Sequence, residues 1–195
     1  MSGPLPVGPF ATIVADPPWP MRWSTGKTRV NGRGERHVNH ATARVLPYTT
    51  MTVGEIAALP VQSVAAADAH LFLWAPDAFV IDGSASLVVR AWGFEPLRFI
   101  VWRKPGFGMG VFPRPQHELL LVARRGRARF AVRDAGSVQL WKQPYHRTAA
   151  GVGRRHSAKP DESRALIERA SSGPYLELFA RSARDGWSAW GDEAP

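Results

Sequence analysis

Short apolar runs bounded by Gly, Pro or charged residues recur along this chain. Each is four to six residues long, which is the length of a buried strand and too short for a helix with its own apolar face. The runs cover residues 10–15, 69–74, 98–102, 118–123 and 175–180, and a further short run covers 187–190. We expect these segments to form the strands of a sheet.

Segments with helical character separate several of these runs. Thr52 and Glu55 have the spacing of a capping box, so we expect a short helix that Pro60 ends. A second helix is expected over residues 77–92, although Asp82-Gly83-Ser84 weakens its first half. The alternation of strands and helices indicates an α/β fold.

The clearest helix start is Lys159-Pro160-Asp161-Glu162, where proline and acidic residues occupy the first turn. Strands that alternate with helices predict an open, largely parallel sheet with helices on both faces. Ligands of such sheets bind beyond the carboxyl ends of the strands. At 195 residues the chain is long enough for one well-cored domain, so we expect a single domain over residues 1–195.

Two segments have no apolar periodicity and are predicted to be functional loops. Residues 20–47 are polar and basic, and a segment this long inside a compact domain is typical of a substrate-binding loop. Residues 103–117 surround a Gly- and Pro-rich stretch and are predicted to form a second loop at the site.

The net charge is +9, with 25 basic residues of which 21 are arginine. Such a charge favours a polyanionic partner such as nucleic acid, although a GC-rich genome would also replace lysine by arginine. The basic residues gather in two segments, which we expect to flank one groove for a phosphate backbone. The first contains Arg22, Lys27, Arg29, Arg33, Arg36 and Arg44, and the second contains Arg124, Arg125, Arg127, Arg129 and Arg133.

The composition excludes several classes of protein. Without cysteine there are no disulfides and no thiolate metal sites, and the six histidines lack the paired spacing typical of zinc, so no metal is expected. No apolar stretch approaches the roughly 20 residues of a membrane span. The first residues lack the features of a signal peptide, so a cytoplasmic protein is expected.

The most informative motif is Asp16-Pro17-Pro18-Trp19, directly after the first predicted strand. Two prolines end the strand and remove two backbone donors, which leaves carbonyl oxygens beside a carboxylate and an indole ring. These groups match an amino group on a planar base, which has two hydrogens to donate and a face to cover. The alternative is a strand-end turn with a buried tryptophan.

Five segments together resemble the MT-A70 family of N6-adenine methyltransferases over residues 11–193. They are Asp16-Pro17-Pro18-Trp19, Tyr48-Thr49-Thr50-Met51, Leu71-Phe72-Leu73-Trp74, Lys159-Pro160-Asp161 and Glu177-Leu178-Phe179-Ala180-Arg181. The resemblance implies a Rossmann-like methyltransferase sheet with permuted motif order, in which the catalytic strand precedes the cofactor-binding strand. Residues 108–111 and 116–120 resemble bacterial and phage members, which implies a bacterial or phage-encoded protein and favours DNA as the substrate.

The resemblance also implies S-adenosylmethionine as the cofactor. Glu177 would accept hydrogen bonds from the ribose hydroxyls, and Lys159 would lie near the methionine carboxylate. Asp192 and Glu193 stand where the eukaryotic enzyme has an amide pair against the cofactor adenine. The implied cofactor-binding residues are Lys159, Ser157, Glu177, Phe179, Arg181, Asp192 and Glu193.

In the implied reaction, Asp16 and the Pro17 carbonyl accept the two N6 hydrogens of a flipped-out adenine, and Trp19 stacks on the base. Asp16, Pro17, Pro18 and Trp19 are therefore the expected catalytic residues. The expected substrate-binding residues are Tyr48, Lys104, Glu118, Arg22, Lys27, Arg29, Arg33 and Arg36.

Other functions remain open at this point. RNA is an alternative substrate, since a basic groove binds phosphate without identifying the sugar. Cytosine N4 presents a similar amino group to a similar pocket. A non-catalytic nucleic-acid-binding subunit is a third alternative, and the chain could form a homodimer or bind a related subunit.

Overall fold

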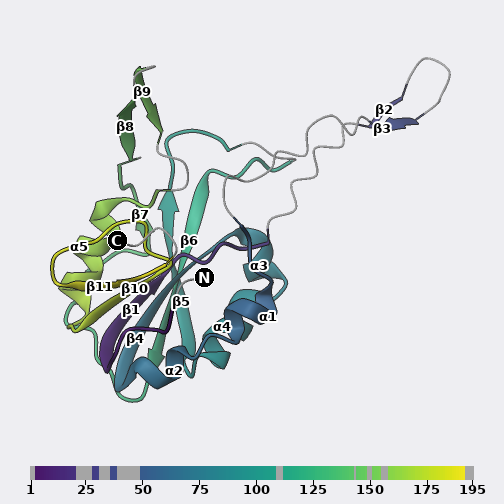
Figure 1. The fold of residues 1–195 in the computed structure, drawn as a ribbon. Helices are drawn as coiled ribbons and strands as arrows, with labels where there is room; N and C mark the ends of the chain where they lie inside the picture. The colour runs from purple at the N-terminus through teal and green to yellow at the C-terminus, as the bar shows by residue number, and fades with distance from the viewer. Residues whose placement is uncertain are drawn as a thin grey trace.

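A seven-stranded sheet forms the centre of the protein (Figure 1). The computed structural model describes residues 3–20, 28–30, 36–38, 49–108, 112–142, 144–148, 151–154 and 158–191. The strand order is β11-β10-β1-β4-β6-β5-β7. The strands are β1 (Phe10–Ala15), β4 (Ala65–Ala75), β5 (Glu95–Arg103), β6 (His117–Arg125), β7 (Val138–Gln139), β10 (Tyr175–Leu178) and β11 (Trp187–Trp190).

The sheet is largely parallel, as predicted. β1 pairs in parallel with both β4 and β10, β10 pairs in parallel with β11, and β5 pairs in parallel with β7. In this sheet only β6 runs antiparallel to its neighbours, β4 and β5. The carboxyl ends of β1, β4 and β10 therefore meet at one edge of the sheet, where the loop that leads into β6 also arrives.

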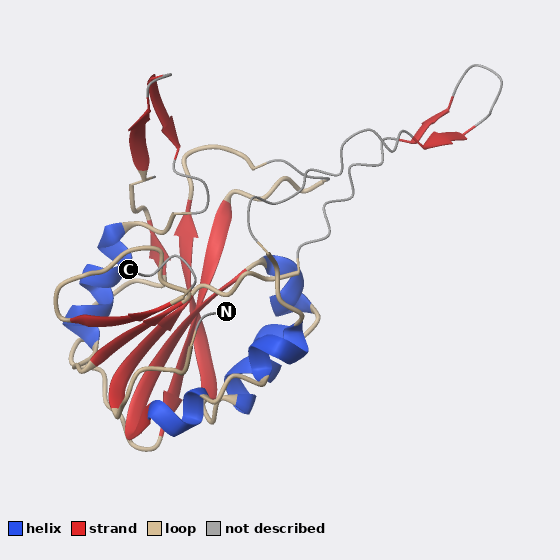
Figure 2. Cartoon of the chain, viewed as in Figure 1, coloured by secondary structure: helices blue, strands red, loops and turns tan. Residues whose placement is uncertain are grey.

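Helices cover both faces of the sheet, which confirms the predicted α/β class (Figure 2). On one face, α1 (Val53–Ala57), α2 (Val61–Val64), α3 (Asp77–Ile81) and α4 (Ser84–Ala91) pack on inward side chains such as Ile13 and Leu71. On the other face, α5 (Asp161–Ala170) packs on Val14 and Phe72 through Ile167. Neighbouring strand residues thus point to opposite faces, which explains why these runs are apolar throughout.

The helix starts follow the sequence signals closely. The Thr52 Oγ1 atom accepts from the Glu55 backbone N–H at 3.2 Å, and the Glu55 carboxylate accepts from the Thr52 N–H at 2.7 Å, so the capping box is confirmed. The single helix expected over residues 77–92 is divided into α3 and α4. The division lies at Gly83, whose φ of 83° is the left-handed conformation that glycine tolerates best.

The end of β10 and the presence of two hairpins differ from expectation. β10 ends at Leu178, two residues early, because Phe179 has a φ of 61° and the Ala180 N–H donates to the Trp190 carbonyl. The hairpins β2 (Thr28–Val30) with β3 (Arg36–Val38), and β8 (Tyr145–Thr148) with β9 (Gly151–Arg154), were not predicted, since neither has an apolar face in its sequence. No helix among the described residues is long and apolar enough to cross a membrane.

The expected pairing of two basic segments around one groove is wrong for the second segment. Arg124 and Arg125 end β6, and because β6 is antiparallel they lie opposite His70 and Ala69 on β4. Ala75 lies six residue steps along β4 from Ala69, so this end is about 20 Å from the edge that carries Asp16. Arg125 there donates to the Gln62 carbonyl, and Arg127 donates from its backbone to Asp68.

Candidate active site

Asp16 lies at the edge where the parallel strands end, one residue beyond β1. Its Oδ2 atom accepts a hydrogen bond from the Lys159 Nζ atom at 2.7 Å. Lys159 immediately precedes Pro160, the N-cap of α5, and its side chain is only 10% exposed. The motif after the first strand and the helix start 143 residues later thus meet in one buried ion pair.

Lys159 also contacts Glu118, which extends the ion pair into a cluster. The Lys159 Nζ atom lies 3.4 Å from the Glu118 Oε2 atom, and Lys104 donates to the Glu118 Oε1 atom. Glu118 is the second residue of β6 and pairs with Trp102 near the end of β5, so Lys104, directly after β5, comes from the neighbouring strand. The structure brings together four of the predicted site residues, namely Asp16, Lys104, Glu118 and Lys159.

Two buried indole rings line this cluster. The Lys159 ammonium lies 5.4 Å from the centre of the Trp74 ring, and the Lys104 ammonium lies 4.9 Å from that of Trp102. The negative face of an indole attracts a cation, and the effect grows where water is excluded. Each lysine is therefore held between a carboxylate and an aromatic face, and its position is well defined.

The pKa values of the two carboxyl groups in the cluster, Asp16 and Glu118, are shifted in opposite directions. Burial raises the pKa of Asp16 above its usual 3.8, and the opposing attraction of Lys159 does not fully offset it. Burial would also raise the pKa of Glu118, but Lys159 and Lys104 together lower it. Burial would lower the pKa of Lys159, yet the Asp16 and Glu118 carboxylates raise it above 10.5, so the lysine stays charged.

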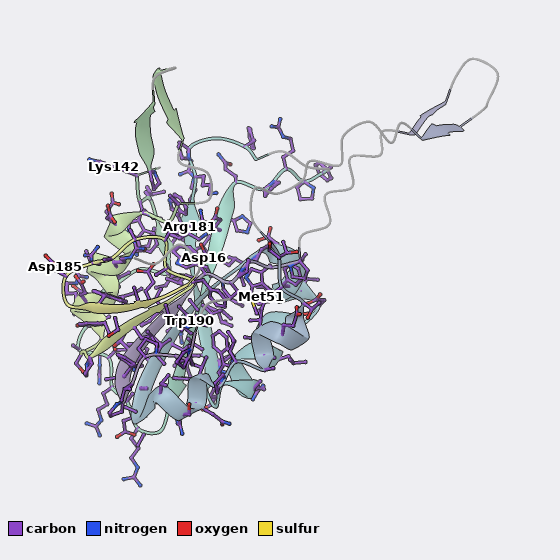
Figure 3. All side chains as sticks on the ribbon, in the orientation of Figure 1. Asp16, Met51, Lys142, Arg181, Asp185 and Trp190 are labelled. Atoms are coloured by element: carbon purple, nitrogen blue, oxygen red, sulfur yellow. The ribbon has the colours of Figure 1, made fainter. Side chains whose placement is uncertain are left out.

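Arg181 adds a further positive charge at this edge. Figure 3 shows it beside Asp16, and its charge favours the ionised form of Asp16 while disfavouring that of Lys159. Arg181 lies two residues after Phe179, which has a left-handed backbone with a φ of 61°. This conformation is uncommon for residues other than glycine and is concentrated at functional sites. The edge beside β10 therefore combines a positive charge with an uncommon backbone conformation.

The turn after Asp16 is fixed by hydrogen bonds to both proline carbonyls. The Trp19 N–H donates to the Pro17 carbonyl at 2.8 Å, and the Met51 N–H donates to the Pro18 carbonyl at 2.9 Å. A carbonyl oxygen has two lone pairs, so the Pro17 oxygen retains one for a further donor. The predicted pair of acceptors, Asp16 and Pro17, is thus present in a turn that the segment before α1 holds in place.

Trp19 does not form the open stacking surface that the sequence suggests. Its side chain is 4% exposed, its ring stacks on Phe79 with centres 4.9 Å apart, and its Nε1 atom donates to the Trp74 carbonyl at 2.9 Å. The alternative of a strand-end turn with a buried tryptophan describes this side chain better. Trp19 anchors the motif between the sheet and α3.

Replacing Trp19 by phenylalanine tests this anchoring role. The loss of the indole N–H leaves the buried Trp74 carbonyl without its donor, so we expect the free energy of unfolding to fall by about 1–3 kcal/mol. Thermal or urea unfolding measures this loss. If Trp19 instead stacks on a base, the stability would change little and the KM for nucleic acid would rise.

Trp92→Phe is the matched control for that variant. Its Nε1 atom donates to the Ile56 carbonyl at 3.0 Å and its ring is fully buried, but it lies among the helices away from Asp16. We expect both variants to lose similar stability, and only Trp19→Phe to lower kcat through a displaced turn.

Glu177, the predicted ribose acceptor, is bound by an arginine. The Arg164 Nε atom donates to the Glu177 Oε2 atom at 3.0 Å and its Nη2 atom donates to Oε1 at 2.5 Å. Burial would lower the pKa of Arg164, but the Glu177 carboxylate raises it. This two-point contact fixes the plane of the carboxylate at the end of β10.

Arg164 and the lining indoles were not predicted as site residues. Arg164 follows Asp161 by three residues on α5, a spacing that suggests only a surface ion pair, and only the fold shows that it faces Glu177. Asp77 also reaches this edge, where its Oδ1 atom lies 3.1 Å from the His117 Nε2 atom. Its position after an apolar strand resembles that of Asp16, and this signal could have indicated it.

Nine predicted site residues fall on parts of the chain whose side chains the structure does not describe. Seven of them, namely Tyr48, Arg22, Lys27, Arg33, Ser157, Asp192 and Glu193, lie outside the described residues. Arg29 lies in β2 and Arg36 in β3, where only the backbone is described. Within the described part of the chain, no group of three or more His, Asp or Glu side chains could hold a metal ion.

Relatives with similar sequences cover nearly all of the chain. The type II methyltransferase M.MunI of a Mycoplasma species is 29% identical over 98% of this chain and 80% of its own length. The N6-methyladenosine RNA methyltransferase MTA1 of Cryphonectria parasitica is 30% identical over 94% of this chain and 51% of its own length. The human N(6)-adenine-specific methyltransferase METTL4 is 26% identical over 94% of this chain.

The chain therefore spans about half or less of the fungal and human relatives, 51% and 37% of their lengths. The sequence model of the MT-A70 family matches residues 10–193, which include the Asp16 motif, the Lys159 helix start and the Glu177 strand. With the site geometry and this match together, the chain belongs to the MT-A70 family of N6-adenine and adenosine methyltransferases.

Proposed function

We propose that this protein uses S-adenosylmethionine to methylate the exocyclic N6 of adenine in nucleic acid, with DNA as the preferred substrate and a single catalytic domain. The observation that carries the proposal is the Asp16 carboxylate, held by the buried Lys159 at the carboxyl end of β1. The family match over residues 10–193 supports the same chemistry. DNA is favoured because residues 108–111 and 116–120 resemble bacterial and phage members, and because a Mycoplasma relative aligns with 98% of the chain.

The chemistry asked of the protein is mainly positioning. The adenine N6 lone pair is delocalised into the ring, so the nitrogen is a poor nucleophile until its hydrogens are held out of conjugation. Asp16 and the Pro17 carbonyl accept these two hydrogens and favour a tetrahedral nitrogen. Lys159 orients the Asp16 carboxylate and opposes its protonation, so that Asp16 acts as an acceptor and stabilises the positive charge that develops on N6.

The residues at this edge fit the proposed cofactor in their chemistry. Glu177 offers a carboxylate for ribose hydroxyls, and the two bonds from Arg164 leave further lone pairs on its oxygens. Lys159 and Arg181 give the edge the positive charge that suits a methionine carboxylate. When bound, S-adenosylmethionine supplies the methyl group. The permuted motif order depends on this assignment of Glu177 and the β10 strand to the cofactor.

Arg164 is a positioning residue for Glu177 in this proposal. Without its two hydrogen bonds the Glu177 carboxylate can rotate, so we expect Arg164→Met to weaken S-adenosylmethionine binding about tenfold. Isothermal titration calorimetry with S-adenosylmethionine measures the effect in the absence of nucleic acid. Arg164→Lys, which restores the charge without the two-point contact, should recover only part of the affinity.

Arg184→Met is the control for the Arg164 variant. Arg184 pairs with Glu168 at 3.3 Å and with Asp161 at 3.8 Å, so it belongs to the same α5 ion-pair group without contacting Glu177. Its loss should leave cofactor affinity unchanged. Equal weakening in both variants would show that Arg164 acts only through the stability of α5.

Labelled methyl transfer tests the proposed function directly. The protein is incubated with methyl-labelled S-adenosylmethionine and random-sequence duplex DNA, single-stranded DNA or RNA, and the product nucleosides are then separated. N6-methyladenine in DNA is the expected product. N6-methyladenosine in RNA would assign the protein to the activity that the fungal relative's name describes, and N4-methylcytosine would change the target base.

A protein that binds nucleic acid but neither binds the cofactor nor transfers label would be the non-catalytic subunit instead. The predicted contacts of Tyr48 and of the basic residues at 20–47 with the substrate remain part of the proposal. The proposal also includes the formation of a homodimer or the binding of a related partner subunit.

A further inference from the structure

Two exposed aromatic side chains mark the loop between β5 and β6. Phe112 is 96% exposed and Phe107 is 64% exposed. Burying a phenylalanine side chain is worth about 1.5–3 kcal/mol, so each of these rings carries stabilisation that the described structure does not use. Single exposed apolar residues are common, but two rings on one loop beside a proposed active site indicate a contact surface.

This loop begins and ends at the charged cluster around Asp16. Lys104, at its start, contacts Glu118, and Glu118, just after its end, contacts Lys159. Its two limbs continue the pairing of the sheet, since the Lys104 N–H donates to the Gln116 carbonyl at 2.9 Å. Figure 2 shows the described limbs of this loop, in tan, leaving the end of the sheet at which β5 finishes. The exposed rings are thus tied to the site by a short, paired base.

Hydrogen bonds and close packing stiffen the loop beyond this base. The Gly108 N–H donates to the Pro115 carbonyl at 2.6 Å, and the Arg114 Nε atom donates to the Gly108 carbonyl at 2.9 Å. A Cβ atom on Gly108 would lie 3.0 Å from the Pro115 oxygen, so the limbs approach as closely as glycine allows. Prolines at 105, 113 and 115 restrict the backbone further. Because these described limbs are held together, presenting an aromatic ring from them loses little conformational entropy on binding.

Arginine and lysine accompany the rings. The Arg114 guanidinium lies 5.7 Å from the centre of the Phe107 ring, and Arg103 and Lys104 precede the loop. This combination of apolar rings and positive charge matches a nucleic acid, whose base faces are flat and apolar and whose backbone is anionic. A protein partner would be expected to meet the rings with fewer cationic neighbours.

We infer that residues 105–108 and 112–116, the described limbs of this loop, form a wedge that enters duplex DNA and fills, with the Phe112 ring, the space left by the adenine flipped into the Asp16 pocket. This inference rests on the proposed function. An adenine in a duplex cannot reach Asp16 while it is stacked, and unstacking costs a few kcal/mol. Stacking of an aromatic side chain on a neighbouring base returns about 1–3 kcal/mol.

The length of the loop suits this role. The limb from Lys104 to Gly108 spans up to about 13 Å at roughly 3.3 Å per residue. The major groove of B-DNA is about 8.5 Å deep, so a loop of this length reaches the base stack from a rim that rests on the backbone. Arg114 would then contact a phosphate beside the inserted ring.

The wedge predicts a substrate-dependent effect of Phe112→Ala. Single-stranded DNA has no stack to open, whereas duplex DNA does. We expect Phe112→Ala to lower methyl transfer to random-sequence duplex DNA at least about tenfold, and transfer to the same strands heat-denatured by less than about twofold. Phe112→Trp, which keeps a stacking ring, should retain most of the duplex activity. Ile81→Ala, at a site 85% exposed on α3, is the control and should change neither.

A second readout follows flipping without methyl transfer. Once the wild-type product has shown which adenine is methylated, 2-aminopurine replaces it in a duplex, and its fluorescence rises when the base leaves the stack. The wild type should produce this rise, and Phe112→Ala should reduce it several-fold. Sedimentation of both proteins establishes whether the oligomeric state is the same.

The outcomes separate the inference from the proposed function. Equal loss on duplex and single strands, or wild-type transfer to single strands alone, would overturn the wedge while leaving the methyltransferase in place. Equal loss together with a change in oligomeric state would assign the loop to a protein contact. Absence of wild-type transfer to any nucleic acid would overturn the proposed function, and the wedge with it.

Discussion

Replacing Asp16 by asparagine is expected to lower methyl transfer about 100- to 1,000-fold. The amide keeps the shape of the side chain but loses the negative charge that stabilises the developing positive charge on N6, and one of its two acceptors becomes a donor. Losses of this size follow the removal of one preorganised group that acts on charge in a transition state. Labelled transfer under saturating cofactor and nucleic acid measures kcat directly.

The fold should survive this substitution. Lys159 keeps Glu118 as a counter-charge 3.4 Å away, and the buried amide no longer carries a desolvated charge. Cooperative thermal unfolding and unchanged nucleic-acid binding check this. Asp68→Asn is the matched control, because the Asp68 carboxylate accepts from the Arg127 N–H at the opposite end of the same sheet. Full activity in Asp16→Asn would refute the acceptor role.

The strands and helix starts of this protein could be predicted because their signals are local. An apolar run between turn residues becomes a strand with little reference to the rest of the chain, and the Thr52–Glu55 capping box is confirmed within four residues. β7, with two residues paired to the end of β5, has no such signal and exists only through its neighbour. The division between α3 and α4 was visible as Gly83, but its consequence depended on tertiary packing.

The site could be predicted only as far as chemistry alone identifies a residue. Asp16 and Lys159 were indicated by their motifs. They meet at one edge of the sheet because α5, which Lys159 precedes, packs on β1, which Asp16 follows. Trp19 has the chemistry of a stacking surface, yet a large apolar ring next to a core is more favourably buried, and it is. The second basic segment lies at the far end of the sheet because β6 runs antiparallel to β4. The residues of that segment do not indicate the direction of the strand.

The charge balance of the cluster around Asp16 depends most on Lys159, the lysine that both carboxylates share. Lys159 contacts both Asp16 and Glu118, whereas Lys104 contacts only Glu118 among the carboxylates described. Removing Lys104 therefore leaves every carboxylate paired, while removing Lys159 leaves Asp16 without its hydrogen-bond donor beside a second negative charge. Because Lys159 contacts both carboxylates, it is the electrostatic centre of the site.

We expect Lys159→Met to lower methyl transfer at neutral pH at least about 100-fold and to reduce the free energy of unfolding by about 3–5 kcal/mol. The stability loss follows from leaving the buried Asp16 carboxylate without its hydrogen-bond donor, whereas Glu118 keeps Lys104. The activity loss follows because Lys159 lowers the pKa of Asp16, while Glu118 raises it. Without the lysine a larger fraction of Asp16 is protonated, and a protonated carboxyl donates to N6 where it should accept.

The pH dependence distinguishes this electrostatic role from a purely structural one. In the wild type, transfer should fall as the pH drops through the pKa of Asp16, which burial places above 3.8. Because the Lys159→Met variant raises that pKa further, the acidic limb of its pH–kcat profile should move to higher pH and part of the lost activity should return as the pH rises. Lys159→Arg keeps the charge and should restore the wild-type limb, and Lys104→Met should displace it much less. An unmoved limb in Lys159→Met would show that the lysine only supports the fold, since a structural loss lowers activity equally at every pH.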